Sequence, residues 1–183
     1  MKRVFAAAVT ALILAGCGGG GGDPAAADPI DRYVGQWRRC DTVGSIFLSW
    51  NVQTEWTITK TNPTTGQLVV HETLTSACGT PPAPTAERKQ IATGHFGLTG
   101  GQQQAQGEAW DRAAIGVTKV GDDCSPSPSV CSTFLQLAQQ SGNTLRTSLP
   151  PVLSAPRLAS SAAFTRGADG YPSTFEVTAL TRE

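Results

Sequence analysis

The chain has 183 residues, and its 14 Lys and Arg balance its 14 Asp and Glu, so the formal net charge at pH 7 is zero. It contains no cluster of basic residues and no run of like charge, which makes nucleic acid and anionic lipid headgroups poor candidates for partners. The length suits one domain with its own hydrophobic core.

The chain begins with a short basic segment at residues 1–3, followed by the apolar run VFAAAVTALILA at residues 4–15. This run is too short to span a bilayer as a helix and ends in small residues, as secretory signal peptides do. The sequence LAGC, ending at Cys17, resembles the bacterial lipobox, in which lipid is added to the cysteine and the chain is cut just before it. The resemblance implies a cleaved signal peptide at residues 1–16 and lipid attachment at Cys17. The alternative is ordinary signal-peptidase cleavage, with Cys17 incidental.

Lipidation would hold the chain on a membrane, because each buried CH₂ of an acyl chain contributes about 0.8 kcal/mol. Gly18 rather than Asp follows Cys17. By resemblance to the sorting preference of enteric bacteria, this favours the outer membrane, with the protein facing the periplasm. Residues 17–30, rich in Gly, Ala and Pro, cannot build a core and are expected to form a flexible tether. Residues 31–183 are then the single folded domain.

Four cysteines remain after Cys17, and an even number in an exported protein indicates two disulfides. Cys124 and Cys131 bracket the short segment SPSPSV, which predicts that they pair and that Cys40 pairs with Cys78. A four-cysteine zinc site is the alternative, but neither pair has the close ligand spacing of such sites. No cofactor or metal is expected.

Residues 45–60 alternate between apolar and polar positions over some twelve residues, which is the period of a β-strand with one buried and one solvent-facing side. The segment NPTTG at residues 62–66 is typical of a tight turn, and QLVVHETL at residues 67–74 is the return strand. The predicted hairpin brings Cys40 and Cys78 to the same end. The apolar side carries Leu48, Trp50, Val52, Trp56 and Ile58.

Further strands are expected within residues 88–100 and 102–120, after a Pro-rich connection. Residues 132–149 suit either two strands joined by SGN or a short helix at their start. The tail has one strand before GADGYP and one after it. About eight strands with turns every ten to fifteen residues predict an all-β fold. The predicted fold class is a roughly eight-stranded antiparallel up-and-down barrel, with a β-sandwich as the alternative.

Gly35-Gln36-Trp37 resembles the Gly-x-Trp motif that opens lipocalins and the wider calycin group of eight-stranded barrels. In that group the tryptophan plugs the closed end of the barrel and an arginine near the last strand packs over its ring. The resemblance therefore implies a structural plug of Gly35, Trp37 and Arg182, with Arg166 as the fallback arginine. The small periplasmic barrels that inhibit secreted proteases begin with a similar segment and are a second resemblance.

The sequence has no motif for a nucleophile, a metal protease or a phosphate-binding loop, and His71 and His95 suit ordinary strand or surface positions. We therefore predict that the protein is not an enzyme. The apolar face of residues 48–58, together with Trp110, either fills the core or binds a small lipophilic ligand. The alternative function is an interaction or inhibitor protein that contacts an envelope protein through its two cysteine-bearing loops, residues 77–87 and 121–131.

Overall fold

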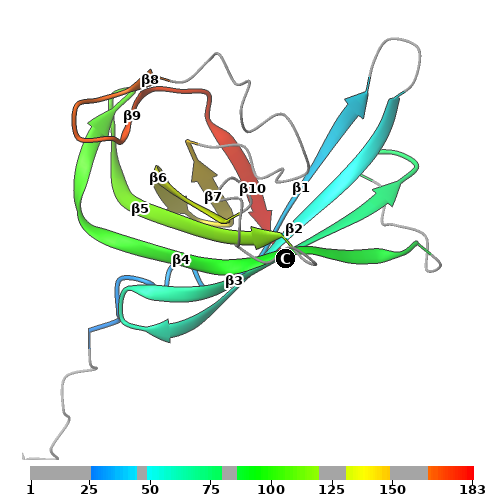
Figure 1. Cartoon of the computed structure of the whole chain (residues 1–183), viewed down its shortest axis with the longest axis horizontal. Helices are drawn as coiled ribbons and strands as arrows, with labels where there is room; N and C mark the ends of the chain where they lie inside the picture. The colour runs from blue at the N-terminus through cyan, green and yellow to red at the C-terminus, as the bar shows by residue number, and fades with distance from the viewer. Residues whose placement is uncertain (1–25, 45–48, 80–85, 120–130, 149–164) are drawn as a thin grey trace, which may run out of the picture.

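The computed structural model describes residues 26–44, 49–79, 86–119, 131–148 and 165–183. Eight strands close into an antiparallel barrel in the order β1-β10-β7-β6-β5-β4-β3-β2, which confirms the predicted barrel over a sandwich. Two further strands, β8 (Thr165–Arg166) and β9 (Pro172–Thr174), form a small separate sheet (Figure 1). The barrel strands are β1 (Gly35–Gly44), β2 (Ser49–Asn62), β3 (Thr65–Thr75), β4 (Arg88–Ala105), β5 (Glu108–Lys119), β6 (Cys131–Ser141), β7 (Thr144–Thr147) and β10 (Thr178–Arg182).

We call the end with the short β2–β3, β4–β5 and β6–β7 turns the base, and the opposite end the mouth. The β4–β5 turn has positive φ at both central residues, Gln106 and Gly107, which is the type I′ geometry that matches the twist of a hairpin. The β6–β7 turn, residues 142–143, joins two strands, so the strand alternative for SGN is confirmed. The described part of the chain holds no helix long and apolar enough to cross a bilayer.

The base is covered by residues 28–34, which precede β1. Ile30 and Tyr33 are fully buried there, and the backbone N–H of Ile30 donates to the carbonyl of Pro63 at 3.1 Å. Lys60 also pairs with Asp28 at 2.6 Å and with Asp31. The fold therefore begins a few residues before the boundary expected at residue 31, because Ile30 is buried in the interior apolar cluster. We call residues 28–34 the base plug.

Two apolar clusters lie on opposite sides of the barrel wall. The larger one fills the interior, and its members are Ile30, Tyr33, Trp37, Trp56, Ile58, Leu68, Val70, Ala92, Phe96, Ala113, Ile115, Val117, Ala138, Leu145 and Leu180. The smaller one is made by Ala105, Trp110, Leu137, Tyr171 and Phe175. It lies on the outer face of β5 and β6, where the segment that carries β8 and β9 covers the barrel (Figure 1). Long-range packing of residues 165–177 thus gives the wall a second, external core.

The Cys40–Cys78 disulfide is present, with its Cα atoms 5.5 Å apart, which confirms this predicted pairing. It crosslinks β1 to the chain just after β3 on the mouth side. The other predicted pair, Cys124–Cys131, involves a cysteine outside the described residues.

Candidate functional site

Three of the predicted ligand-binding side chains are buried among the described residues of the barrel interior. Val52, Trp56 and Ile58 are 6%, 2% and 1% exposed. A cavity large enough for water would leave accessible surface on its lining residues, so these side chains contact protein on all sides. Along the described part of the interior, the side chains of this face therefore form core rather than a ligand cavity.

Two other predicted ligand residues are placed elsewhere. Trp110 lies in the external cluster, where its ring meets Phe175 edge-to-face at 5.3 Å and its Nε1 donates to the carbonyl of Ala105. The expectation that it joins the interior face is wrong, because the neighbouring Asp111 faces inward. Leu48 lies outside the described residues.

The residues predicted from the Gly-x-Trp resemblance, Gly35, Trp37 and Arg182, lie together at the base, next to the base plug. Trp37 is fully buried, and Cζ of Arg182 lies 4.4 Å from its ring centroid. The same guanidinium donates through Nη2 to the carbonyls of Arg32 and Val34. Gly35 has φ +141°, and a Cβ there would lie 3.5 Å from Nε of Arg182, so glycine lets the backbone turn beside the guanidinium. The arrangement stabilises the first and last barrel strands against each other. Arg166, the fallback, lies instead near the carbonyl of Leu135.

Two large apolar side chains that are exposed among the described residues lie at the mouth-side ends of β2 and β3. We call residues 39–44, 49–53 and 73–79 the mouth arm. β1 pairs with β10 only at Trp37 and Arg38, and beyond them β1 and β2 continue together away from the ring (Figure 1). Trp50 is 45% exposed and Leu74 is 64% exposed, and Leu74 lies opposite Val52 in register. Trp50, Val52 and Leu74 therefore share the face that becomes the barrel interior further along β2.

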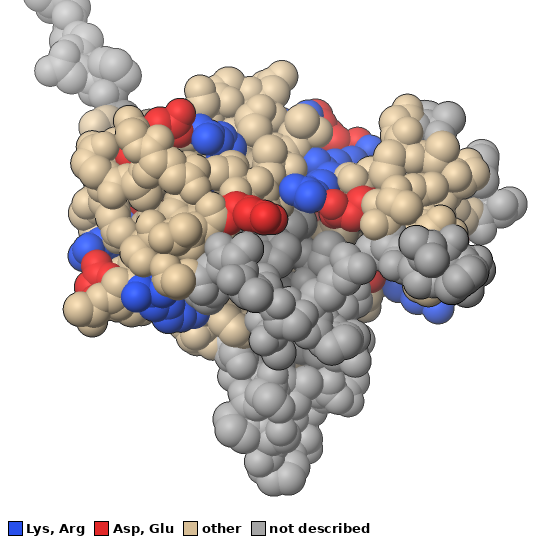
Figure 2. Space-filling model, turned by 90° about the horizontal axis from the view of Figure 1, so that it is seen from above, with Lys and Arg blue, Asp and Glu red and all other residues tan. Residues whose placement is uncertain are grey.

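A charged cluster lies on the outer face of the barrel beside the mouth arm. Glu55, at a position expected to face solvent, is only 4% exposed because Arg38 and Arg88 both pair with it. Burial acts to raise the pKa of Glu55, but Arg88 and then Arg38 outweigh it and hold that pKa below its usual range. Figure 2 shows the same mixing of signs, with basic and acidic side chains in small groups on the face it displays.

His71 lies opposite Glu55 on β3. Burial, and then the charge of Arg88, lower the pKa of His71, although Glu55 opposes the shift. A histidine whose pKa is lower in the folded state contributes stability that is complete above its unfolded pKa of about 6.5 and is lost as pH falls.

We expect His71→Gln to reduce the loss of thermal stability between pH 7.5 and 5.5, measured as the change in Tm. His95→Gln is the matched control. It keeps His71, so its Tm should fall between pH 7.5 and 5.5 by as much as that of the parent. Equal slopes for His71→Gln and the parent would contradict the assignment.

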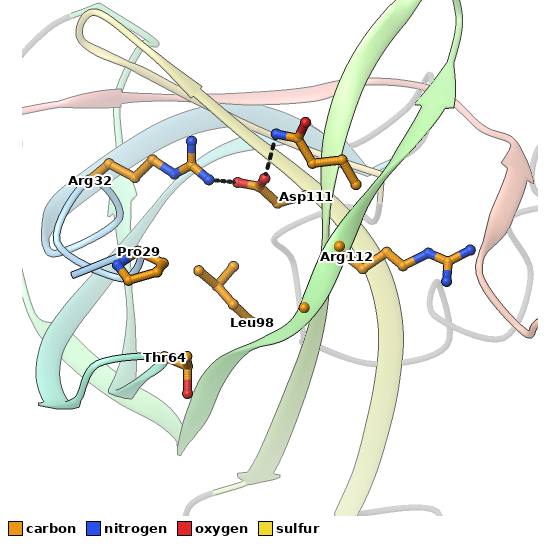
Figure 3. A pocket seen from close by; sticks show the side chains of 9 residues that line it. Pro29, Arg32, Thr64, Leu98, Asp111 and Arg112 are labelled. Atoms are coloured by element: carbon orange, nitrogen blue, oxygen red, sulfur yellow. Dashed lines mark hydrogen bonds and ion pairs between the residues drawn. The ribbon is translucent and has the colours of Figure 1, made fainter. Parts of the chain in front are cut away.

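A pocket of about 230 Å³ opens at the base, between the base plug and β4 (Figure 3). Its lining comprises Pro29, Arg32, Thr64, Leu98, Gly100, Gly101, Gln102, Asp111 and Arg112. The guanidinium of Arg32 reaches across the pocket to Asp111, whereas the side chain of Arg112 points away from it (Figure 3).

Asp111 is the buried charged group beside this pocket, at 7% exposed. One of its oxygens accepts from Arg32 and from the hydroxyl of Tyr33, and the other accepts from Nε2 of Gln102 at 3.1 Å. Burial, and then this hydrogen bond, raise the pKa of Tyr33 far above its usual range, so its hydroxyl stays a donor. Sequence reasoning missed the network. The sequence did contain an indication of it, because Asp111 shares a strand face with the apolar residues at 113, 115 and 117.

No family model matches the chain, and no curated protein or solved structure matches it either. Among the described residues, no three His, Cys, Asp or Glu side chains gather in a way that could hold a metal ion. The arguments for function therefore rest on the mouth arm and the base pocket.

Proposed function

We propose that the chain is a lipid-anchored lipoprotein of the bacterial envelope that binds another envelope protein through the mouth arm and catalyses no reaction. The leader and the LAGC sequence support lipidation at Cys17 and a place in the outer membrane facing the periplasm. The Cys40–Cys78 disulfide suits an exported protein.

The observation that carries this proposal is the contrast between the interior and the mouth arm. Among the described residues, the interior tryptophans Trp37 and Trp56 are 0% and 2% exposed, whereas Trp50 is 45% exposed. Contiguous exposed apolar patches mark binding sites, and tryptophan is enriched among residues that dominate protein interfaces. The disulfide crosslinks β1, which pairs with the strand that bears Trp50, to the chain just after β3, which bears Leu74. This crosslink lowers the entropy cost of docking.

A small lipophilic ligand is the second candidate. Trp50, Val52 and Leu74 share one face of the mouth arm, which could hold an apolar molecule beyond the buried part of that face. Tryptophan suits this function also, because it offers a large apolar surface with one polar atom. The two candidates differ in what lies against Leu74.

A photocrosslinking amino acid in place of Leu74, in the full chain and in the bacterium that produces it, distinguishes the candidates. We expect an adduct of one discrete protein mass, which is lost when Trp50→Ala is added. The same amino acid in place of Gln67, an exposed residue on the other face of β3, is the control. An adduct of small mass alone would support the lipophilic ligand. Equal labelling from positions 74 and 67 would contradict both candidates.

A further inference from the structure

The base pocket exists only in the closed barrel, because its walls come from four separate segments of the chain. The base plug supplies Pro29 and Arg32, the β2–β3 turn supplies Thr64, and β4 and β5 supply the rest. In the β4–β5 ladder, Leu98 lies opposite Ala113 and Gln102 opposite Asp111, so residues 99–101 form a bulge opposite one residue. Such a bulge bends its strand, and here it opens space beside the plug.

Two glycines allow this bulge. Gly100 and Gly101 have φ of +86° and +75°, a region that other residues avoid. A Cβ at either position would meet nothing within 4 Å, so glycine is required by the backbone angle and not by crowding. The same open space leaves this side of the pocket accessible.

The polar wall of the pocket offers hydrogen-bond donors. The side chain of Arg32 is 43% exposed, and it pairs with Asp111 through Nη2. Within the described ranges, Nε and Nη1 of Arg32 donate to no other group. Asp111 already accepts from three donors, so its oxygens are largely used. A ligand at this wall therefore meets the free N–H groups of a guanidinium that is still half exposed to solvent.

The rest of the pocket is largely apolar, with Pro29 beside Arg32 on the base plug and Leu98 on β4 (Figure 3). Its volume of about 230 Å³ is below the roughly 300–1,000 Å³ of pockets for drug-sized ligands. A guanidinium N–H donates a charge-assisted hydrogen bond to a carboxylate oxygen. We propose that the base pocket binds a small organic acid with a short apolar chain, its carboxylate on Arg32 and its chain against Leu98 and Pro29. An inorganic anion would leave most of its oxygens against apolar groups.

The test is calorimetric titration of the full chain with butyrate and with inorganic phosphate, at constant ionic strength and up to 50 mM. We expect saturable binding of butyrate and weaker binding of phosphate. Arg32→Gln should weaken butyrate binding about tenfold or more, because charge-assisted hydrogen bonds are lost. Arg146→Gln is the matched control, since Arg146 also pairs with a carboxylate but lies over Trp110. It should leave binding unchanged.

A second variant guards against loss of the fold. Asp111→Asn removes a negative charge beside the ligand, so it should strengthen butyrate binding severalfold, an effect that unfolding cannot produce. Absence of butyrate binding, equal binding of phosphate, equal effects at Arg32 and Arg146, or weaker binding in a folded Asp111→Asn variant would each overturn the proposal. The site is distant from the mouth arm in the fold, so its failure would leave the docking proposal unaffected.

Discussion

Trp37→Ala should destabilise the domain by about 3–5 kcal/mol, the range measured when a fully buried large aromatic side chain is removed. Trp37 is 0% exposed, and Arg182 lies over its ring, so the change leaves a cavity and removes the surface on which the guanidinium packs. A cation above an indole contributes about 0.5–2 kcal/mol of its own. Urea denaturation followed by circular dichroism measures the loss, which is a large part of the stability of an ordinary domain.

Trp50→Ala is the control for this prediction. Trp50 is 45% exposed on the mouth arm, so its truncation should cost about 1 kcal/mol or less. Equal losses for the two variants would show that Trp37 has no special place in the core.

Replacement of both Cys40 and Cys78 by serine should cost roughly 4 kcal/mol, the second large effect. The crosslink spans a sequence separation of 38 residues, and closing a loop of that length removes chain entropy from the unfolded state. Comparison of urea midpoints between the parent and the double variant, both without reductant, measures the change.

The same variant tests whether the mouth arm depends on this disulfide for its order. Amide hydrogen exchange should accelerate in residues 39–44 and 49–53, while the base turns keep their protection, because β1 and β2 have few barrel contacts beyond Arg38. Uniform acceleration over the whole barrel would instead indicate a purely global effect.

Period-two alternation predicted the long strand β2 because that signal is local, and it placed Val52, Trp56 and Ile58 correctly on one buried face. It could not place Trp110. Both faces of β5 carry apolar residues, and the outer face is covered by residues 165–177, which are distant in the sequence. A single strand pattern contains no information about which remote segment will cover it.

The buried charges were missed for a related reason. Glu55 reads as a solvent-facing residue within β2, and only its neighbours on β1 and β4, Arg38 and Arg88, explain its burial. The base pocket likewise depends on the pairing register of β4 and β5, which leaves three residues opposite one. The glycines at 100 and 101 were visible in the sequence, but their effect was not.

The entry of the chain into the fold at the base determines how the protein would stand on a membrane. If Cys17 carries the lipid, ten residues lie between it and Asp28, and this length of chain spans at most about 40 Å. The mouth arm lies at the opposite end of β2, a strand of 14 residues. The base and its pocket would then be at the end of the barrel nearer the bilayer, and Trp50 and Leu74 at the end farther from it. A protein partner would then bind at the end of the barrel away from the lipid surface, whereas a small acid would reach the base pocket from the membrane side.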